Sequence, residues 1–164
     1  MRRLLPLAAV LLFLVAPAQA NAAKDLWATV NVCDTPKAPN TVGVRGSMPG
    51  NGTRQRLYMR FEAQFFDELK DRFVSTGSRT RWMRVGSARF KSTQAGFSFA
   101  FTDPPAGSEF VMRGIVGYQW RGRRRGRGRL VVVKRARRIT RGGLRGVEGG
   151  DPRGFSAATC VIRP

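Results

Sequence analysis

The sequence predicts an all-β fold, an antiparallel two-sheet sandwich of about eight strands. Along most of the chain, apolar residues alternate with polar ones at a period of two, which is the pattern of strands with one face in a core. Segments rich in Gly, Pro, Asn and Ser interrupt this pattern at fairly even spacing, as turns between short strands do. Both observations favour a sandwich, and a closed β-barrel is the alternative.

The predicted strands are the segments in which the alternation holds. A clear example is 57–65, where the apolar Leu57, Met59 and Phe61 alternate with Tyr58, Arg60 and Glu62. The predicted strands are 26–33, 42–48, 57–65, 81–85, 97–101, 110–120, 130–140 and 155–161. The turns between them are predicted at 36–40, 49–52, 75–78, 103–107 and 142–154.

One short stretch has a helical pattern instead. In FFDELKDRF, residues 65–73, Phe66, Leu69 and Phe73 fall on one face of a helix, and Asp67 is placed to cap it. We therefore expect one or two helical turns after the third strand.

The first twenty residues, MRRLLPLAAVLLFLVAPAQA, have the composition of a secretory signal peptide. Two arginines precede an apolar run that is too short to span a bilayer, and a small-x-small cleavage site ends at Ala20. We expect residues 21–164 to form a single exported domain, located in the periplasm, at the cell surface or in the medium. No apolar stretch after Ala20 reaches spanning length.

The chain has two cysteines, Cys33 and Cys160. An even number of cysteines in an exported chain favours a disulfide. The two residues fall in the first and last predicted strands, so the bridge would join the two ends of the domain. Two separate buried thiols are the alternative.

The chain is strongly basic, with 30 Lys and Arg against 10 Asp and Glu. Much of the excess lies in WRGRRRGRGRLVVVKRARRITRGG, residues 120–143, which contains no acid. On the predicted fold this stretch is a β-hairpin with a basic tip and a basic outer edge. The candidate polyanion-binding residues are Arg121, Arg123, Arg124, Arg125, Arg127, Arg129, Lys134, Arg135, Arg137 and Arg138.

This hairpin has a functional and a structural interpretation. Clustered arginines suit phosphates, sulfates or uronates, so the expected partner is an anionic envelope polymer or a partner protein. Nucleic acid would bind nonspecifically, because no sequence-reading motif is present and no aromatic residue falls between Arg121 and Gly143. The structural alternative is a solvated hairpin whose charges prevent edge-to-edge aggregation, with an arginine count raised by GC-rich codons.

The composition excludes several kinds of catalytic and metal site. The chain has no histidine, so triads and metal sites built on His are excluded, and two cysteines are too few for a zinc site. A carboxylate enzyme acting on polysaccharide would need two facing acids, whereas Glu62 is the only acid in the middle of a predicted strand. We expect Glu62 to be an exposed partner of a cross-strand arginine. The sequence thus predicts a non-enzymatic domain without cofactor or metal.

The segments "LYMRFEAQFF", "RWMRV" and "FVMRGIVGYQWRGR" and their spacing resemble secreted bacterial immunoglobulin-like or fibronectin type III-like modules. The resemblance implies the sandwich architecture and a role in adhesion, display or ligand binding, but it implies no binding residue. The cysteines depart from the immunoglobulin pattern, in which the bridge joins two central strands around a Trp. A purely structural envelope domain is therefore a further alternative.

Overall fold

The computed structural model describes residues 25–123 and 128–164. The predicted signal peptide, residues 1–20, lies outside the described residues, as do the candidates Arg124, Arg125 and Arg127.

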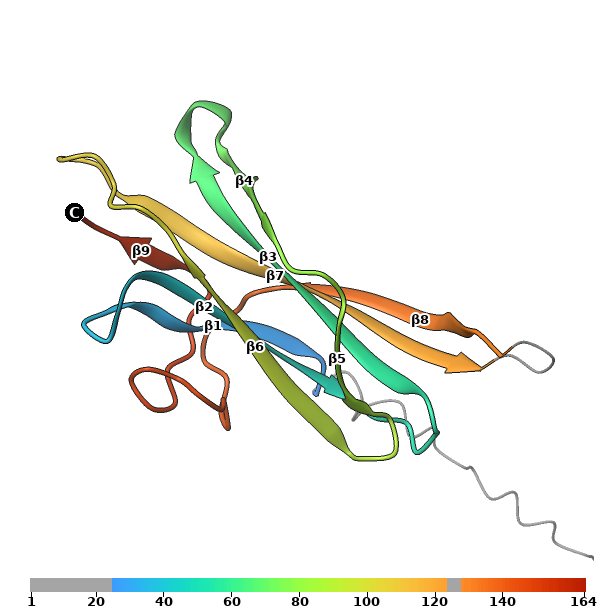
Figure 1. Cartoon of the computed structure of the whole chain (residues 1–164). Coiled ribbons are helices and arrows are strands. Elements are labelled where there is room, and N and C mark those ends of the chain that lie inside the picture. The colour runs from blue at the N-terminus through green and yellow to red at the C-terminus, as the bar shows by residue number, and fades with distance from the viewer. Residues whose placement is uncertain (1–24, 124–127) are drawn as a thin grey trace, which may run out of the picture.

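Within the described ranges the chain forms nine strands and one short 3-10 turn (Figure 1). The strands are β1 (Trp27–Thr35), β2 (Ala38–Pro49), β3 (Arg56–Asp67), β4 (Arg72–Arg79), β5 (Met83–Ser87), β6 (Ser92–Ala100), β7 (Phe110–Arg123), β8 (Leu130–Ile139) and β9 (Cys160–Ile162). The 3-10 turn, η1 (Glu68–Lys70), joins β3 to β4.

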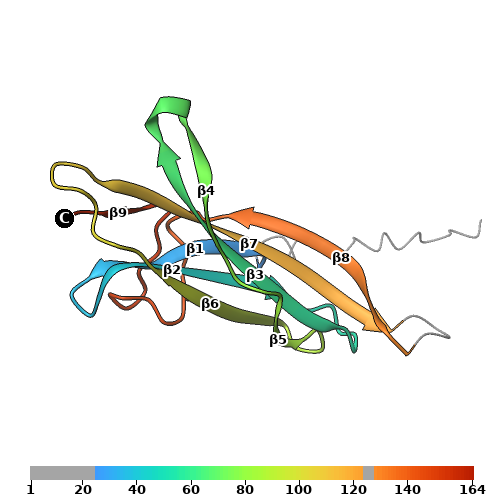
Figure 2. The same ribbon diagram turned by 45° about the horizontal axis from the view of Figure 1, so that its top comes forward.

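The strands form two antiparallel sheets that face each other as two layers (Figure 2). The small sheet has the order β1-β2-β6, and the large sheet has the order β4-β3-β7-β8. β5 also pairs with β3, and β9 also pairs with β7. The predicted antiparallel sandwich is therefore confirmed, and the alternative of a closed barrel is not.

The core lies between the sheets and follows the predicted alternation. On β3, Leu57, Met59 and Phe61 are fully buried, and on β7 the buried side chains include Tyr118 and Trp120. The small sheet contributes Val30, Val42, Val44 and Met48 from the opposite side. Because strand side chains alternate between faces, the intervening residues of β3 and β7 point away from this core.

The predicted disulfide is confirmed. Cys33 of β1 and Cys160 of β9 are bonded across 127 residues of chain. Since β1 belongs to the small sheet and β9 to the large one, the bridge ties the two layers together as well as the first and last strands.

The helix predicted over 65–73 is wrong. β3 continues to Asp67, and Phe66 pairs directly with Phe73 of β4, with the ring centroids 5.2 Å apart. Only the single turn η1 is helical, and Leu69 in it is fully exposed. The Asp67 cap is correct, since its carboxylate accepts the Lys70 N–H. The apolar spacing does not distinguish the two structures, because a hairpin brings Phe66 and Phe73 to one face as a helix would.

Several other boundaries differ from the prediction. β2 begins at Ala38, inside the turn predicted at 36–40, and β6 begins at Ser92 rather than at 97. The turn predicted at 75–78 lies inside β4, where Thr76 Oγ1 donates to the Ala63 carbonyl at 3.0 Å. The last strand is confined to Cys160–Ile162, and its buried residues are Cys160 and Ile162 rather than Val161. Residues 155–159 instead run beside β1, where Val30 and Ala157 exchange two backbone hydrogen bonds. These contacts cover the free edge of β1.

Candidate anion-binding face of the large sheet

The outward residues of β3, β7 and β8 form one continuous surface, which we call the outer face of the large sheet. The pairing of the strands sets its rows, because residues directly opposite each other in a sheet share a face. Across β3, β7 and β8 the rows are Arg56–Arg121, Tyr58–Gln119–Arg135, Arg60–Gly117–Arg137 and Glu62–Ile115–Ile139.

The candidate residues of β8 do not all lie on this face. Arg135 and Arg137 are exposed on it. Lys134 pairs with the buried Trp120, and its Nζ lies 5.0 Å from the centroid of that ring. Arg138 pairs with the buried Val116, so these two cations lie on the opposite side of β8. The predicted basic hairpin is thus divided between two faces.

The other described candidates lie near the tip of the hairpin. Arg121 is on the outer face, as its contacts below show, whereas Arg123 and Arg129 are exposed at the end of β7 and just before β8. Arg123 lines a second hollow that also includes Arg54 and Arg56 of the neighbouring turn and strand. The structure therefore joins the hairpin arginines to basic residues of β3 that the sequence interpretation did not include.

Two aromatic side chains lie among these arginines. Arg121 places its guanidinium 4.0 Å from the ring centroid of Tyr58 and 5.7 Å from that of Trp82. Arg60 lies 4.8 Å from the Trp82 centroid. Tyr58, Arg121, Trp82 and Arg60 therefore form a series in which aromatic rings and guanidinium groups alternate, which we call the planar array. Each such contact is attractive, because the ring face is electron-rich.

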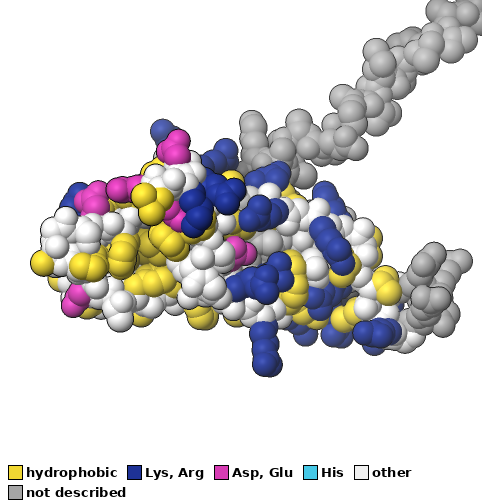
Figure 3. All heavy atoms as spheres, turned by 90° about the horizontal axis from the view of Figure 1, so that it is seen from above, with side chains coloured by type: hydrophobic (Ala, Val, Ile, Leu, Met, Phe, Trp, Pro, Cys, Tyr) yellow, Lys and Arg dark blue, Asp and Glu magenta, His cyan; other side chains and the backbone are white. Residues whose placement is uncertain are grey.

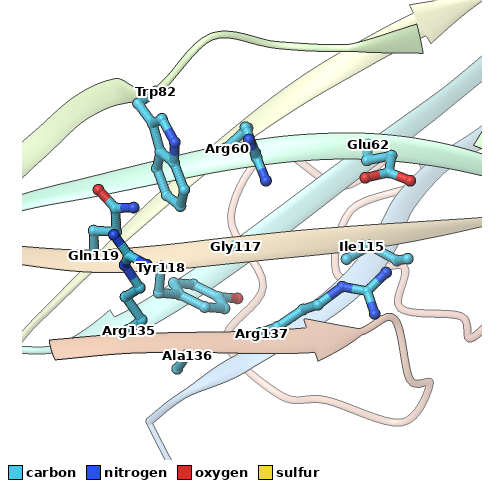
Figure 4. Close-up of a pocket in the computed structure, with 10 residues that line it drawn as sticks. All are labelled: Arg60, Glu62, Trp82, Ile115, Gly117, Tyr118, Gln119, Arg135, Ala136 and Arg137. Atoms are coloured by element: carbon cyan, nitrogen blue, oxygen red, sulfur yellow. The ribbon is translucent and has the colours of Figure 1, made fainter. Parts of the chain in front are cut away.

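A groove of about 500 Å³ runs beside this array (Figure 4). Trp82 and Arg60 lie on its β3 side, Arg135 and Arg137 lie on its β8 side, and β7 runs between them. Gly117 lies in the middle of the groove, directly against the indole of Trp82. A Cβ atom at this position would lie 3.1 Å from Cη2 of Trp82, so the indole is packed against the glycine.

The face carries a large excess of positive charge. Its arginines are Arg56, Arg60, Arg84, Arg121, Arg135 and Arg137, and three of them, Arg60, Arg135 and Arg137, line the groove. Among the described residues, the ion pairs within 4.0 Å join Arg45 to Glu148, Lys70 to Asp67 and Arg163 to Glu109, so none of these six takes part in one.

Glu62 and Arg113, which lie beside these arginines, also reflect the excess of positive charge over negative charge on the face. Glu62 is the one acid lining the groove; Arg79 is its cross-strand neighbour, but the expected ion pair between them is not formed in the described structure. Burial lowers the pKa of Arg113, and the positive charge of Arg137 lowers it further. Figure 3 shows the basic side chains gathered toward the end where β7 meets β8, with most acidic ones toward the other end.

Other kinds of site find little support in the described part of the chain. No group of three or more His, Cys, Asp or Glu residues there is arranged to hold a metal ion. The groove has no second carboxylate beside Glu62, which a glycosidase of the two-acid type would need. None of the helical structure within residues 25–123 and 128–164 has the length and hydropathy of a membrane span.

Comparison of the chain with models of known protein families, with curated proteins and with solved structures finds no match. The geometry of the outer face is therefore the basis for inferring a function.

The aromatic part of this face was missed from the sequence. Tyr58 and Arg60 share the outward parity of the third predicted strand, which was a usable signal. Trp82 comes from the segment between β4 and β5, and its position over Gly117 depends on which strands pair. The observation that no aromatic residue follows Arg121 within the basic stretch is correct, but the rings come from other strands.

Proposed function

We propose that this protein is a non-enzymatic, exported domain that binds an anionic polymer through the outer face of the large sheet. The observation that carries the proposal is one face with six arginines, three of which line a groove that contains a single acid, Glu62. Export is supported by the signal-like residues 1–20 and by the Cys33–Cys160 disulfide, which is compatible with an oxidising compartment.

The arrangement suits a polymer rather than a single small anion. The cations extend over several rows of the sheet, from Arg56 and Arg121 to Arg137, so a chain with repeated negative charges can contact several at once. Guanidinium groups bind phosphate, sulfate and carboxylate through paired hydrogen bonds. Clustered charge of one sign also raises the local concentration of the opposite polymer and makes binding depend on salt.

The proposal can be tested by comparing the two faces of β8. The double variant Arg135→Gln/Arg137→Gln removes two charges from the outer face, and Lys134→Gln/Arg138→Gln removes two from the other side of the same strand. The measurement is the anisotropy of a labelled sulfated polysaccharide and of a labelled DNA oligomer over a salt series, with circular dichroism to verify folding.

We expect the outer-face variant to lose about tenfold or more in affinity, and its log–log salt slope to fall by about 1.5, as two lost ionic contacts predict. The control variant should lose much less. Equal losses in both variants would show that net charge alone matters, and the proposed face would be wrong.

A further inference from the structure

We infer that the polymer is a single-stranded nucleic acid, whose bases stack on the planar array while its phosphates contact the arginines of β8. This inference rests on the proposed function and adds the class of ligand. It is carried by the juxtaposition of Tyr58, Arg121, Trp82 and Arg60 with Arg135 and Arg137 across Gly117.

The planar array favours a planar ligand. Two rings and two guanidinium groups alternate, with distances of 4.0 Å, 5.7 Å and 4.8 Å between an arginine Cζ atom and a ring centroid, and each of these groups is flat. Nucleobases are flat and stack on aromatic rings and on guanidinium planes alike. The rings of a polysaccharide are puckered, so they can use a Trp face but gain little from flat guanidinium groups. One stacked base contributes about a factor of ten in affinity.

The two sides of the groove match the two parts of a nucleotide. Trp82 and Arg60 of the array lie on the β3 side of the groove, and the exposed Arg135 and Arg137 lie on the β8 side. Adjacent strands are about 4.8 Å apart, so the sides are separated by roughly 10 Å across β7. Arg135 and Arg137 are two positions apart on one strand and therefore about 6.6 Å apart, a repeat that suits successive phosphates. A single nucleic-acid strand that lies extended along β7 can direct its bases to the β3 side of the groove and its phosphates to the β8 side.

Glu62 and Gly117 add to this preference. The Glu62 carboxylate lines the same groove, where it can accept hydrogen bonds from the amino groups of bases. Gly117 lets the Trp82 indole pack directly on the floor of the groove, beside the position proposed for a base. A DNA duplex keeps its base faces stacked on one another, so it can contact the arginines but cannot use Trp82.

The experiment compares a single-stranded DNA oligomer, its duplex and a sulfated polysaccharide of similar charge, at about 0.15 M salt, by anisotropy and by intrinsic fluorescence. Trp27 and Trp120 are 7% and 2% exposed in the core, so Trp82 is the tryptophan that a ligand on this face contacts. The variants are Trp82→Leu, Trp82→Phe and Gly117→Val. Phe90→Leu is the control, since this side chain is 69% exposed outside the groove.

We expect the single strand to bind more tightly than the duplex and the polysaccharide, and to quench the emission of the wild-type protein. Trp82→Leu should lose about tenfold for the single strand and little for the other two polymers, with Trp82→Phe restoring most of the loss. Gly117→Val should act like Trp82→Leu without a change in charge. Phe90→Leu should have no effect.

Different results would overturn the two proposals separately. Equal or tighter binding of the polysaccharide, or no quenching by the single strand, would overturn the nucleic-acid inference and leave the anionic-polymer function standing. Should Trp82→Leu fail to fold, the wild-type quenching and the Gly117→Val affinity still decide. Unchanged binding of all three polymers by the Arg135→Gln/Arg137→Gln variant would instead overturn the proposed function.

Discussion

Tyr118 shows how one side chain connects the two sheets beneath the outer face. Its ring is fully buried, and its phenol donates a hydrogen bond to the Trp27 carbonyl of β1. Gly46 of β2 makes room for it, since a Cβ there would lie 2.8 Å from the Tyr118 hydroxyl. The position of Tyr118 on β7 thus helps to fix the strand that carries Gly117 on its opposite face.

Tyr118 also gives the protein a pH-dependent stability. Burial raises the pKa of its phenol far above the usual range. Its contribution is complete below the unfolded-state pKa of about 10 and is lost as pH rises above it, because the unfolded chain then ionises and the folded one does not. We expect the free energy of unfolding of the wild type to fall relative to that of Tyr118→Phe by about 1.4 kcal/mol per pH unit there. Parallel curves for the two proteins in denaturant titrations between pH 9 and 11 would contradict this expectation.

Also at the residue scale, the sequence predicts which arginines form the basic hairpin, but it does not predict which side chains lie next to them. Alternation alone implies that Arg135 and Arg137 share a face that Lys134 and Arg138 do not. The residues that each of these cations contacts depend on the register between β7 and β8. This register shifts at an irregularity between Trp120 and Arg121 on β7. A shift of one residue reverses the faces, so the pattern could not place the planar array.

At the scale of elements, the strands with strict alternation were predictable and the irregular ones were not. β3 and β7 keep apolar residues at every second position, so both were placed correctly apart from their ends. β4 contains Gly77 at φ +81° and lies at the edge of the large sheet, where pairing imposes no such pattern on the sequence. Its polar composition therefore resembled a turn.

The β3–β4 hairpin was mistaken for a helix for a related reason. Short apolar spacings in a nine-residue window fit a helix and a hairpin equally well. The deciding interaction is the cross-strand pair of Phe66 and Phe73, with the Arg113 guanidinium 4.0 Å from the centroid of the Phe73 ring. This contact brings residues of three strands together, so no local pattern reveals it.

At the scale of the whole molecule, two properties follow from composition and pattern: the two-layer architecture and the disulfide. The sheet order does not. β6 pairs with β2 instead of with its chain neighbours β5 and β7, and all these strands show the same period of two. Pattern therefore predicts that strands form layers, while packing between the layers decides which strands share one.

The disulfide makes a testable contribution at this scale. Cys33 and Cys160 close a loop with a sequence separation of 127 residues, and β9 is only three residues long. Because the bridge reduces the freedom of the unfolded chain, the double variant Cys33→Ala/Cys160→Ala should lower the free energy of unfolding by about 4 kcal/mol in urea titrations. A change below about 1 kcal/mol would show that the packing of β9 and residues 140–159 suffices. Polymer affinity of the folded variant should be unchanged, since neither cysteine lines the groove.

We propose above that the outer face of the large sheet is the surface that binds the polymer. The most direct measurement is a titration of ¹⁵N-labelled protein with a single-stranded DNA oligomer at about 0.15 M salt, followed by the chemical shifts of assigned backbone amides. We expect the largest shifts at 58–60, 117–121 and 135–137, together with the indole N–H of Trp82. Large shifts confined to β1, β2 and β6, or spread evenly over all exposed basic residues, would contradict the claim.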